Sequence, residues 1–300
     1  RPMQAATQLG WLRNGEFAPL MIAEANGFFE AEGIQHRIVD GGPGRNPVPI
    51  VAAGQPQFGL ATSGLHLLAA RTARDPVDIV ALGALYQKTP SSYLAIAAAS
   101  DPEPTPKSLE GRSVGIQAGS EYFCRAMARL NSVDASKIRI VTVQANAEPL
   151  LVGRVDFFSG WITNQAYQIE QETAKADAPA NIRGKGWKAI RFSDWGLNSY
   201  SDVIFATKRT TQENPELVRG YLKAVAQAIR FILDNPEESV RLVAGFQGVT
   251  ENAEKLAWRW RVQNPLFVSD DTQARGPLAM NAATWTAGSD LLRDANEIPR

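Results

Sequence analysis

The sequence has few of the residues that build disulfides and metal sites. Cys124 is the only cysteine among 300 residues, and there are two histidines. A single cysteine excludes a disulfide within the chain. Together with two histidines it cannot by itself supply the four ligands of a zinc site. We therefore expect no metal, no cofactor and no disulfide framework.

The sequence also lacks an excess of charge and any long apolar run. Lys plus Arg and Asp plus Glu both number 31, so the formal net charge is zero. Without a basic block we expect no nucleic-acid partner. No run of about 18 apolar residues is present, so no segment is predicted to span a membrane. The chain opens at Arg1 and Pro2 without a charged-then-apolar leader, and we expect any signal peptide to have been removed.

What the sequence does contain is an alternation of strand-like and helix-like segments. The strand patterns fall at residues 5–11, 33–39, 57–61, 77–85, 113–117, 138–143, 155–158, 187–192 and 203–206. Helices are predicted between them, after Pro19, Ser63 and Ser120 among others, and over 161–175. Three more follow residues 214, 235 and 252. This alternation predicts an α/β fold with mostly parallel sheets flanked by helices.

One proline-rich stretch interrupts the alternation. Pro102, Pro104 and Pro106 stand within five residues. Proline at that density is incompatible with a helix interior or a central strand. We therefore expect a domain boundary there.

Six local patterns in order resemble the periplasmic solute-binding proteins of ABC importers for taurine, sulfonates, nitrate and thiamine-pyrimidine precursors. They are the Trp-x-x-Asn opening at 11–23, Ala-x-x-x-Gly-Phe-Phe-x-x-x-Gly at 23–33, Val-x-x-Gly-x-x-x-Phe-Gly at 51–59, Ser-Leu-x-Gly-Arg-x-Val-Gly at 108–115, Gly-x-Val-Asp-Phe at 153–157 and Asn-Pro-Glu-Leu-Val at 214–218. The resemblance covers nearly the whole chain.

The chain departs from the thiamine-precursor branch at several positions. Arg13 stands in place of a proline, Phe17 in place of a histidine and Pro19 in place of a glycine. Gln57 replaces an acid in the third pattern. These differences leave the expected fold intact and bear on which ligand is bound.

The resemblance implies a two-lobed periplasmic-binding-protein fold of type II, with a ligand cleft between the lobes. The first lobe would combine residues 1–97 and 203–300, and the second would span 98–202. Two chain crossings would form a hinge that closes on ligand. The implied function is the periplasmic or lipid-anchored receptor of an ABC importer, a monomer that delivers a small molecule to the transporter permease.

The candidate ligand-binding residues stand where strands end or helices begin, the usual place for ligands in α/β proteins. In the first lobe they are Trp11, Asn14, Gly42, Gly44, Ser63, Tyr86 and Gln87. In the second lobe they are Ser120, Glu121, Tyr122, Trp161, Asn164, Trp195 and Asn198, with Tyr200 and Asp202 before the return strand. Each also has a plain structural interpretation as a turn, cap or packing residue.

The kinds of residue in this set favour a flat, polar heteroaromatic ligand. Trp11, Tyr86 and Trp161 offer ring faces, and Asn14, Ser63 and Glu121 offer hydrogen bonds. Asp202 could pair with a ligand amine or serve as a hinge cap. The alternative is a receptor for a small anion such as a sulfonate, taurine or nitrate, although no arginine is convincingly placed for one.

An enzyme is the less favoured class. The sequence contains no Gly-x-Ser-x-Gly, His-Glu-x-x-His or Walker motif. Thiamine-pyrimidine synthases that share the implied fold use a cysteine-rich motif and a catalytic histidine, and neither pattern is present. A biosynthetic enzyme of that kind, or a ligand-sensing module, remains the competing hypothesis.

Overall fold

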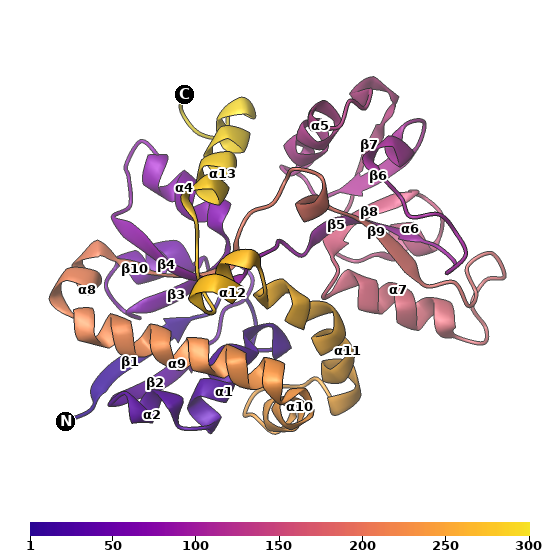
Figure 1. Cartoon of the computed structure of the whole chain (residues 1–300). Coiled ribbons are helices and arrows are strands. Elements are labelled where there is room, and N and C mark those ends of the chain that lie inside the picture. Colours follow the sequence, from indigo (N-terminus) through magenta and orange to yellow (C-terminus); the bar gives the residue numbers. More distant parts are fainter. The chain divides into compact units, whose positions relative to one another are not determined.

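The computed structural model describes all 300 residues and divides into two compact units (Figure 1). The first unit consists of Arg1–Lys88 and Ser199–Arg300, and the second of Thr89–Asn198. The chain thus leaves the first unit once and returns to it once.

The first unit is built on a five-stranded sheet. Its strands are β1 (Met3–Gln8), β2 (Ile34–Val39), β3 (Phe58–Ser63), β4 (Ile79–Tyr86) and β10 (Ser201–Thr207), in the order β2-β1-β3-β10-β4. β1 is parallel to β2 and β3, whereas β10 is antiparallel to β3 and β4. Four strands therefore run in one direction and only β10 runs against them.

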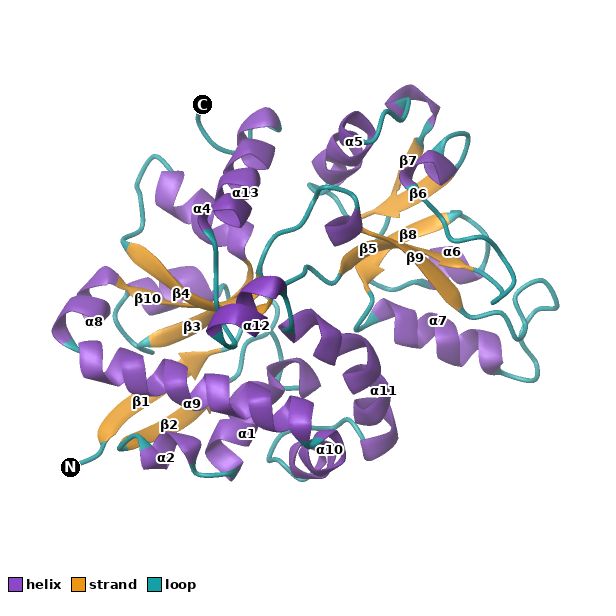
Figure 2. Cartoon of the chain, in the orientation of Figure 1, coloured by secondary structure: helices purple, strands orange, loops and turns teal.

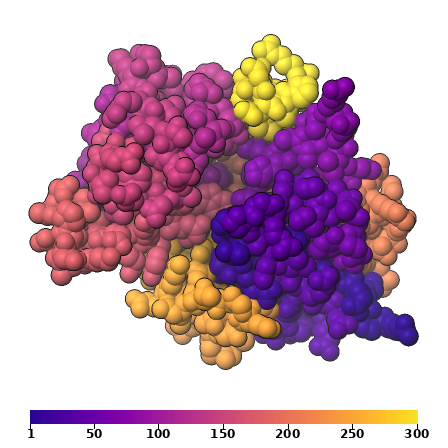
Figure 3. Space-filling model, turned by 180° about the vertical axis from the view of Figure 1, so that it is seen from behind, coloured from indigo at the N-terminus to yellow at the C-terminus, as the bar shows by residue number.

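Helices cover this sheet (Figure 2). They are α1 (Ala18–Ala25), α2 (Phe28–Ala31), α3 (Pro47–Ala52), α4 (Gly64–Thr72), α8 (Lys208–Glu213), α9 (Pro215–Asp234), α10 (Pro236–Ala244), α11 (Ala253–Gln263), α12 (Asp270–Arg275) and α13 (Ala282–Asp294). In the space-filling view the gold atoms of the late segment lie against the indigo atoms of the early one (Figure 3). None of the helices is long and apolar enough to cross a membrane.

Helix α9 forms one side of the core of this unit. Pro215 begins it, where a missing N–H costs nothing, and its buried residues recur at helical spacing. Tyr221 from this face stacks on Phe58 of β3 with ring centroids 3.8 Å apart. Its hydroxyl lies 2.7 Å from the hydroxyl of Thr7 on β1. The predicted amphipathic helix thus packs on both β1 and β3.

The second unit repeats the same sheet plan. Its strands are β5 (Ser91–Ile96), β6 (Ser113–Ile116), β7 (Arg139–Thr142), β8 (Phe157–Trp161) and β9 (Trp187–Arg191), in the order β7-β6-β8-β5-β9. Helices α5 (Glu121–Leu130), α6 (Glu148–Leu151) and α7 (Gln165–Ala174) accompany them. β6 is parallel to β7 and β8, and β5 is antiparallel to β8 and β9.

In each sheet the reversed strand is the first one after the chain changes unit. β5 follows the crossing at Lys88/Thr89, and β10 follows the crossing at Asn198/Ser199. No crossover helix within its own unit precedes such a strand, so the rule that makes successive strands parallel does not apply to it. The sheets are mostly parallel for this reason and not wholly so.

Three details differ from the sequence-based expectations. The chain returns to the first unit at Asn198/Ser199, earlier than the expected boundary at 202/203, because Ser201 already pairs with β3 and β4. The crossing into the second unit lies before β5, earlier than the expected boundary at 97/98, because β5 hydrogen-bonds to β8 and β9. The helix expected over 161–175 begins only at Gln165, because β8 continues through Trp161. The Trp161 amide donates to Gln165 Oε1 at 2.9 Å, which closes the turn between them.

Gly59→Ala tests the packing between β3 and its neighbours. A Cβ at Gly59 would lie 2.6 Å from the Phe205 ring and 2.9 Å from a methyl of Val51. We expect a loss of about 1–3 kcal/mol in the free energy of unfolding, measured by urea titration. Gly245→Ala is the control, since its added Cβ meets nothing closer than 3.6 Å. Equal stability of the two variants would contradict the packing described.

Candidate functional site

The carboxyl ends of the parallel strands lie at one edge of the first unit's sheet, and the start of the reversed strand β10 joins them. We call this the first edge: loop 9–16, loop 40–46, Ser63, Tyr86 and Ser201–Asp202. The Gly41 amide donates to the Trp11 carbonyl at 3.0 Å, which ties the two loops together. The Gly64 amide donates to the Tyr200 carbonyl at 2.8 Å. Nine predicted residues therefore come together here or immediately beside it.

Trp11 is the exposed aromatic side chain of the first edge. Its side chain is 47% exposed, and that of Leu12 is 53% exposed. The loop approaches its neighbour so closely that a Cβ at Gly41 would lie 2.5–2.8 Å from backbone atoms of Leu9 and Trp11. Only glycine allows that contact. Trp11 is thus not a core residue, and its position leaves the indole open to a stacking partner.

Asn14 fixes the shape of the same loop. Its Oδ1 accepts from the Glu16 amide at 2.8 Å, and its Nδ2 donates to the Leu12 carbonyl at 2.8 Å. Both ends of the side-chain amide are therefore engaged within the loop. The geometry gives Asn14 the part of a turn residue that presents Trp11.

Ser63 and the glycines of loop 40–46 border the first edge. The Ser63 hydroxyl accepts from the Leu65 amide at 3.2 Å and so caps α4. Gly42 is buried, and Gly44 is exposed with a left-handed φ of 74°. These residues shape the edge through backbone and cap geometry.

Tyr86 and Gln87 are wholly buried, which does not support the expectation that Tyr86 offers a second stacking face. The Tyr86 ring packs 5.5 Å from that of Phe267. Gln87 Nε2 donates to the Ala84 carbonyl at 3.1 Å, and Gln87 Oε1 accepts from Ser269 Oγ at 2.9 Å. Both side chains join the end of β4 to the C-terminal segment.

Tyr200 also has a packing role. Its hydroxyl accepts from the Asn281 amide at 2.8 Å, and its ring lies 5.7 Å from Trp285. Its neighbour in the predicted set, Asp202, is different. Asp202 is 1% exposed, and the structure gives no hydrogen-bond partner to its Oδ2.

A buried ion pair between Glu251 and Arg259, which sequence reasoning missed, anchors the Trp11 loop at Gly15. Arg259 on α11 donates through Nη2 to Glu251 Oε2 at 2.8 Å. Glu251 Oε1 in turn accepts from the Gly15 amide at 2.6 Å. Gln263 Nε2 donates to the Gly15 carbonyl at 2.9 Å. The residues lie more than 230 positions from Gly15, so no local pattern could have revealed them.

Carboxyl groups outnumber the cation in this buried cluster. Burial raises the pKa of Glu16 to about 7, with Glu251 adding to the rise and Arg259 opposing it. Burial, and then Glu16, raise the pKa of Asp202 well above its usual range. At Glu251 burial also acts upward, but Arg259 and the Gly15 amide outweigh it and lower that pKa. One arginine therefore stabilises the charge of one carboxylate and leaves two that favour the protonated form.

The corresponding edge of the second unit is formed by the ends of β6 and β8 and the start of β5. Gln117 Nε2 donates to the carbonyls of Ser159, at 3.0 Å, and Gln144, at 3.2 Å. The Ser92 hydroxyl donates to the Gly160 carbonyl at 3.1 Å. These bonds join the loops that carry most of the second-unit candidates.

The second-unit candidates differ in accessibility. Trp161 is half-buried, and Asn164 is exposed just before α7. Ser120 precedes α5 without a side-chain capping bond, and Glu121 Oε2 accepts from the Gly119 amide at 2.9 Å. The Tyr122 ring stacks on Phe123 at 4.2 Å. Ser120, Glu121, Tyr122 and Trp161 are all half-buried, so Asn164 is the most exposed of these five candidates.

The last two candidates lie just before the chain returns to the first unit. The Trp195 carbonyl accepts from Asn131 Nδ2 at 3.0 Å, and its side chain is half-buried. Asn198 Oδ1 accepts from the Thr89 amide at 3.0 Å. Asn198 thus ties together the two strands of chain that enter and leave the second unit.

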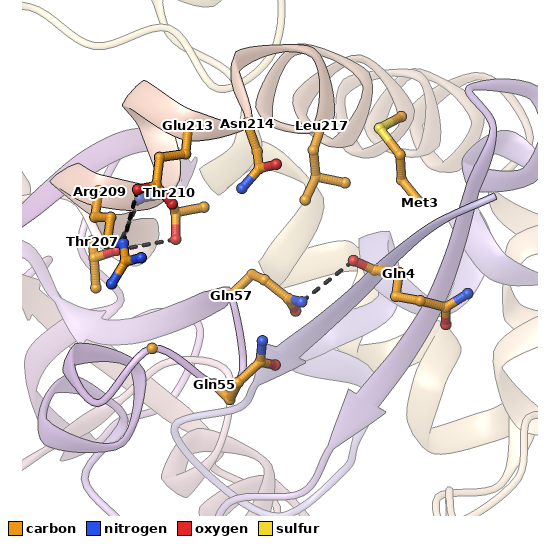
Figure 4. Close-up of a pocket in the computed structure, with 11 residues that line it drawn as sticks. Met3, Gln4, Gln55, Gln57, Thr207, Arg209, Thr210, Glu213, Asn214 and Leu217 are labelled. Atoms are coloured by element: carbon orange, nitrogen blue, oxygen red, sulfur yellow. Dashed lines mark hydrogen bonds and ion pairs between the residues drawn. The ribbon is translucent and has the colours of Figure 1, made fainter. Parts of the chain in front are cut away.

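A hollow of about 380 Å³ lies at the opposite edge of the first sheet (Figure 4). Gln57 Nε2 donates to the Gln4 carbonyl at 3.3 Å, and Arg209 pairs with Glu213 at 3.0 Å. Its polar side chains are largely bound to one another, and it lies away from the carboxyl ends of the strands. It is therefore not the candidate site. No group of three or more metal-ligating side chains is present.

Arg259→Met tests the buried ion pair. Removing the guanidinium leaves Glu251 buried and unpaired, so we expect a loss of about 3–5 kcal/mol in the free energy of unfolding. Adding Glu251→Leu should restore part of that loss, because the uncompensated charge is then removed. Denaturant titration of both variants measures this. A double variant less stable than Arg259→Met would contradict the interpretation.

Glu16→Gln tests the raised pKa of Glu16. Between the unfolded value of 4.5 and about 7 the folded state holds a proton that the unfolded state has lost. Stability should therefore fall as pH rises across that window, by about 1.4 kcal/mol for each pKa unit of difference. Melting curves should show a smaller fall for Glu16→Gln, whereas the exposed Glu297→Gln should keep the wild-type slope. Identical slopes for all three proteins would refute the assignment.

Comparison with known proteins places this geometry in a family. The family described as NMT1/THI5 like matches residues 14–239. The riboflavin-binding protein RibY of Chloroflexus aurantiacus is 26% identical over 303 residues, covering 97% of this chain and 81% of that protein. The 4-amino-5-hydroxymethyl-2-methylpyrimidine phosphate synthase of Legionella pneumophila is 24% identical over 242 residues, covering 78% of this chain and 71% of the synthase.

The fold has its own match among solved structures. The periplasmic aliphatic sulphonate binding protein SsuA of Escherichia coli superposes with a TM-score of 0.73 at 16% identity. The match covers 100% of this chain and 95% of that one. At this identity the likeness shows the fold alone. The chain therefore belongs to the NMT1/THI5-like family and has the α/β fold of the periplasmic binding proteins.

Proposed function

We propose that this protein is the extracytoplasmic solute-binding component of an ABC importer and captures a small heteroaromatic solute. The proposal includes a ligand site between two lobes that close by a hinge at the crossings. The closed form would deliver the solute to a membrane permease. Relatives named for riboflavin binding and for a pyrimidine phosphate synthase both concern heteroaromatic compounds, which supports this ligand class.

The observation that carries the proposal is the exposed indole of Trp11. It is 47% exposed at the carboxyl edge of the first sheet, on a loop held by buried hydrogen bonds to Gly15. A loop that is already ordered loses little conformational freedom when a ligand binds to it. Stacking on a flat ring adds about 0.5–1.5 kcal/mol beyond the area it buries.

Arg13, two residues after Trp11 in the sequence, does not favour an anion receptor. Arg13 Nε pairs with Asp40 Oδ1 at 2.7 Å, and its Nη1 donates to the Gln247 carbonyl at 3.0 Å. Its guanidinium also lies 5.9 Å from the centre of the Phe246 ring. Its Nη2 also donates to the Ile38 carbonyl at 3.3 Å, so a sulfonate would have to compete with four partners. Arg13 therefore serves the loop structure.

The cysteine content argues for a receptor over a pyrimidine synthase. Cys124 is the only cysteine, and it is buried on α5. A cysteine-rich motif of the kind expected for the enzymes cannot be assembled from it. A binding protein needs no such group, which is why binding is the function proposed.

A ligand panel with one substitution tests the proposal. Calorimetry should detect binding of riboflavin or 4-amino-5-hydroxymethyl-2-methylpyrimidine, and neither taurine nor ethanesulfonate should bind. Trp11→Ala should weaken the affinity more than tenfold, because stacking and buried area are both lost. Trp11→Phe should retain most of it. If the sulfonates bind and the heteroaromatic compounds do not, the anion receptor is the correct function.

A further inference from the structure

Buried acceptor oxygens without a donor are concentrated in the first unit. They are Gln8 Oε1, Asp202 Oδ2, Gln263 Oε1 and Asn264 Oδ1. Each is an amide or carboxyl oxygen, which accepts hydrogen bonds. A buried polar atom left without a partner costs about 1–3 kcal/mol, so native proteins leave few of them. These four acceptor oxygens could therefore each accept a hydrogen bond that the protein does not provide.

The charged groups around Asp202 also leave its carboxyl group without a dedicated partner. The charged and titratable groups that act on it and its cluster are Glu16, Glu251, Arg259 and Tyr86. Arg259 is already bound to Glu251, and Lys255 reaches Glu251 at 3.6 Å. Two cations thus serve one carboxylate. Asp202 and Glu16 are left without a cation of their own.

Asp202 lies at the first edge. Ser201, the residue before it, pairs with Ser63 at the end of β3 and with Tyr86 at the end of β4. The Asp202 backbone has a φ of 46°, in the left-handed region that residues other than glycine seldom adopt. The carboxyl group is therefore held at the strand ends where this fold class binds ligands, in a conformation that costs free energy.

We propose that Asp202, with Glu16 beside it, is a subsite that accepts a hydrogen bond from an amino or ring N–H group of the ligand. This inference rests on the proposed function and narrows its ligand to a heteroaromatic compound with N–H donors. The ligand N–H donates to Asp202 Oδ2, and the carboxyl proton passes to the buffer. The bound carboxylate then has the donor that the protein does not supply.

The subsite would distinguish ligands that donate hydrogen bonds from ligands that only accept them. A sulfonate or nitrate offers only acceptor oxygens, and its negative charge would meet carboxyl groups. An aminopyrimidine offers N–H donors and can approach without repulsion. The same groups that attract the heteroaromatic amine therefore reject the anion.

Calorimetry of 4-amino-5-hydroxymethyl-2-methylpyrimidine in two buffers of different ionisation enthalpy tests the subsite. The wild type should release protons on binding, and affinity should rise with pH. Asp202→Asn should abolish most of the proton release and weaken binding by roughly ten- to a hundredfold, the range for a hydrogen bond to a charged group. Glu16→Gln should reduce the pH dependence, and the exposed Asp75→Asn should leave both properties unchanged.

The comparison compound is 5-hydroxymethyl-2-methylpyrimidine, which lacks the amino group. The wild type should bind this compound more weakly than it binds the aminopyrimidine. Asp202→Asn should bind this compound as tightly as the wild type does. If the aminopyrimidine binds without proton release and with equal affinity to wild type and Asp202→Asn, the subsite is wrong and the proposed function stands. If neither pyrimidine nor riboflavin binds, the proposed function fails and the subsite fails with it.

Discussion

The geometry of the candidate site depends on one buried ion pair, that between Glu251 and Arg259. The pair is expensive to bury, and pairs of this kind add little net stability. What it provides is a fixed acceptor for the Gly15 amide at 2.6 Å, so that the loop after β1 has a single arrangement. Gln263 completes the anchor by donating to the carbonyl of the same residue. The exposed Trp11 is presented by a loop whose base cannot move freely.

The same ion pair sets the electrostatics of its surroundings. Because Arg259 is hydrogen-bonded to Glu251, its charge offsets the burial of Glu16 and Asp202 only in part, and each of these carboxyl groups favours its protonated form. Under the proposed function, this one cluster affects both stability and ligand recognition. The loop that carries Trp11 is anchored to Glu251 at Gly15 and exposes its indole. This arrangement suits a neutral aromatic ligand with hydrogen-bond donors.

The family accommodates both receptors and synthases, and the fold does not distinguish between them. The distinction lies in side chains. Here the relevant positions hold an exposed indole, amides and carboxyl groups, and the only cysteine is buried in the second unit. Those groups can bind and orient a flat molecule, which is the basis for the binding role proposed here.

The sequence by itself determined the α/β class, most strands and helices, the loop that holds Trp11, and the start of the helices after Ser63 and Ser120. Strand and helix periodicities, helix caps and prolines are local signals, and they reached the right elements to within a few residues. Asp202 was a candidate because it was expected just before the return strand, and the structure places it as the second residue of that strand, β10.

Only the tertiary structure decided what surrounds those residues. Glu16, Glu251 and Arg259 carry no local motif, and they meet because α11 packs under the loop after β1. Tyr86 looked available at its strand end, but Phe267, far along the chain, packs against its ring. Burial and pairing depend on contacts between distant segments, and a pattern read along the chain contains no information about which distant segment arrives.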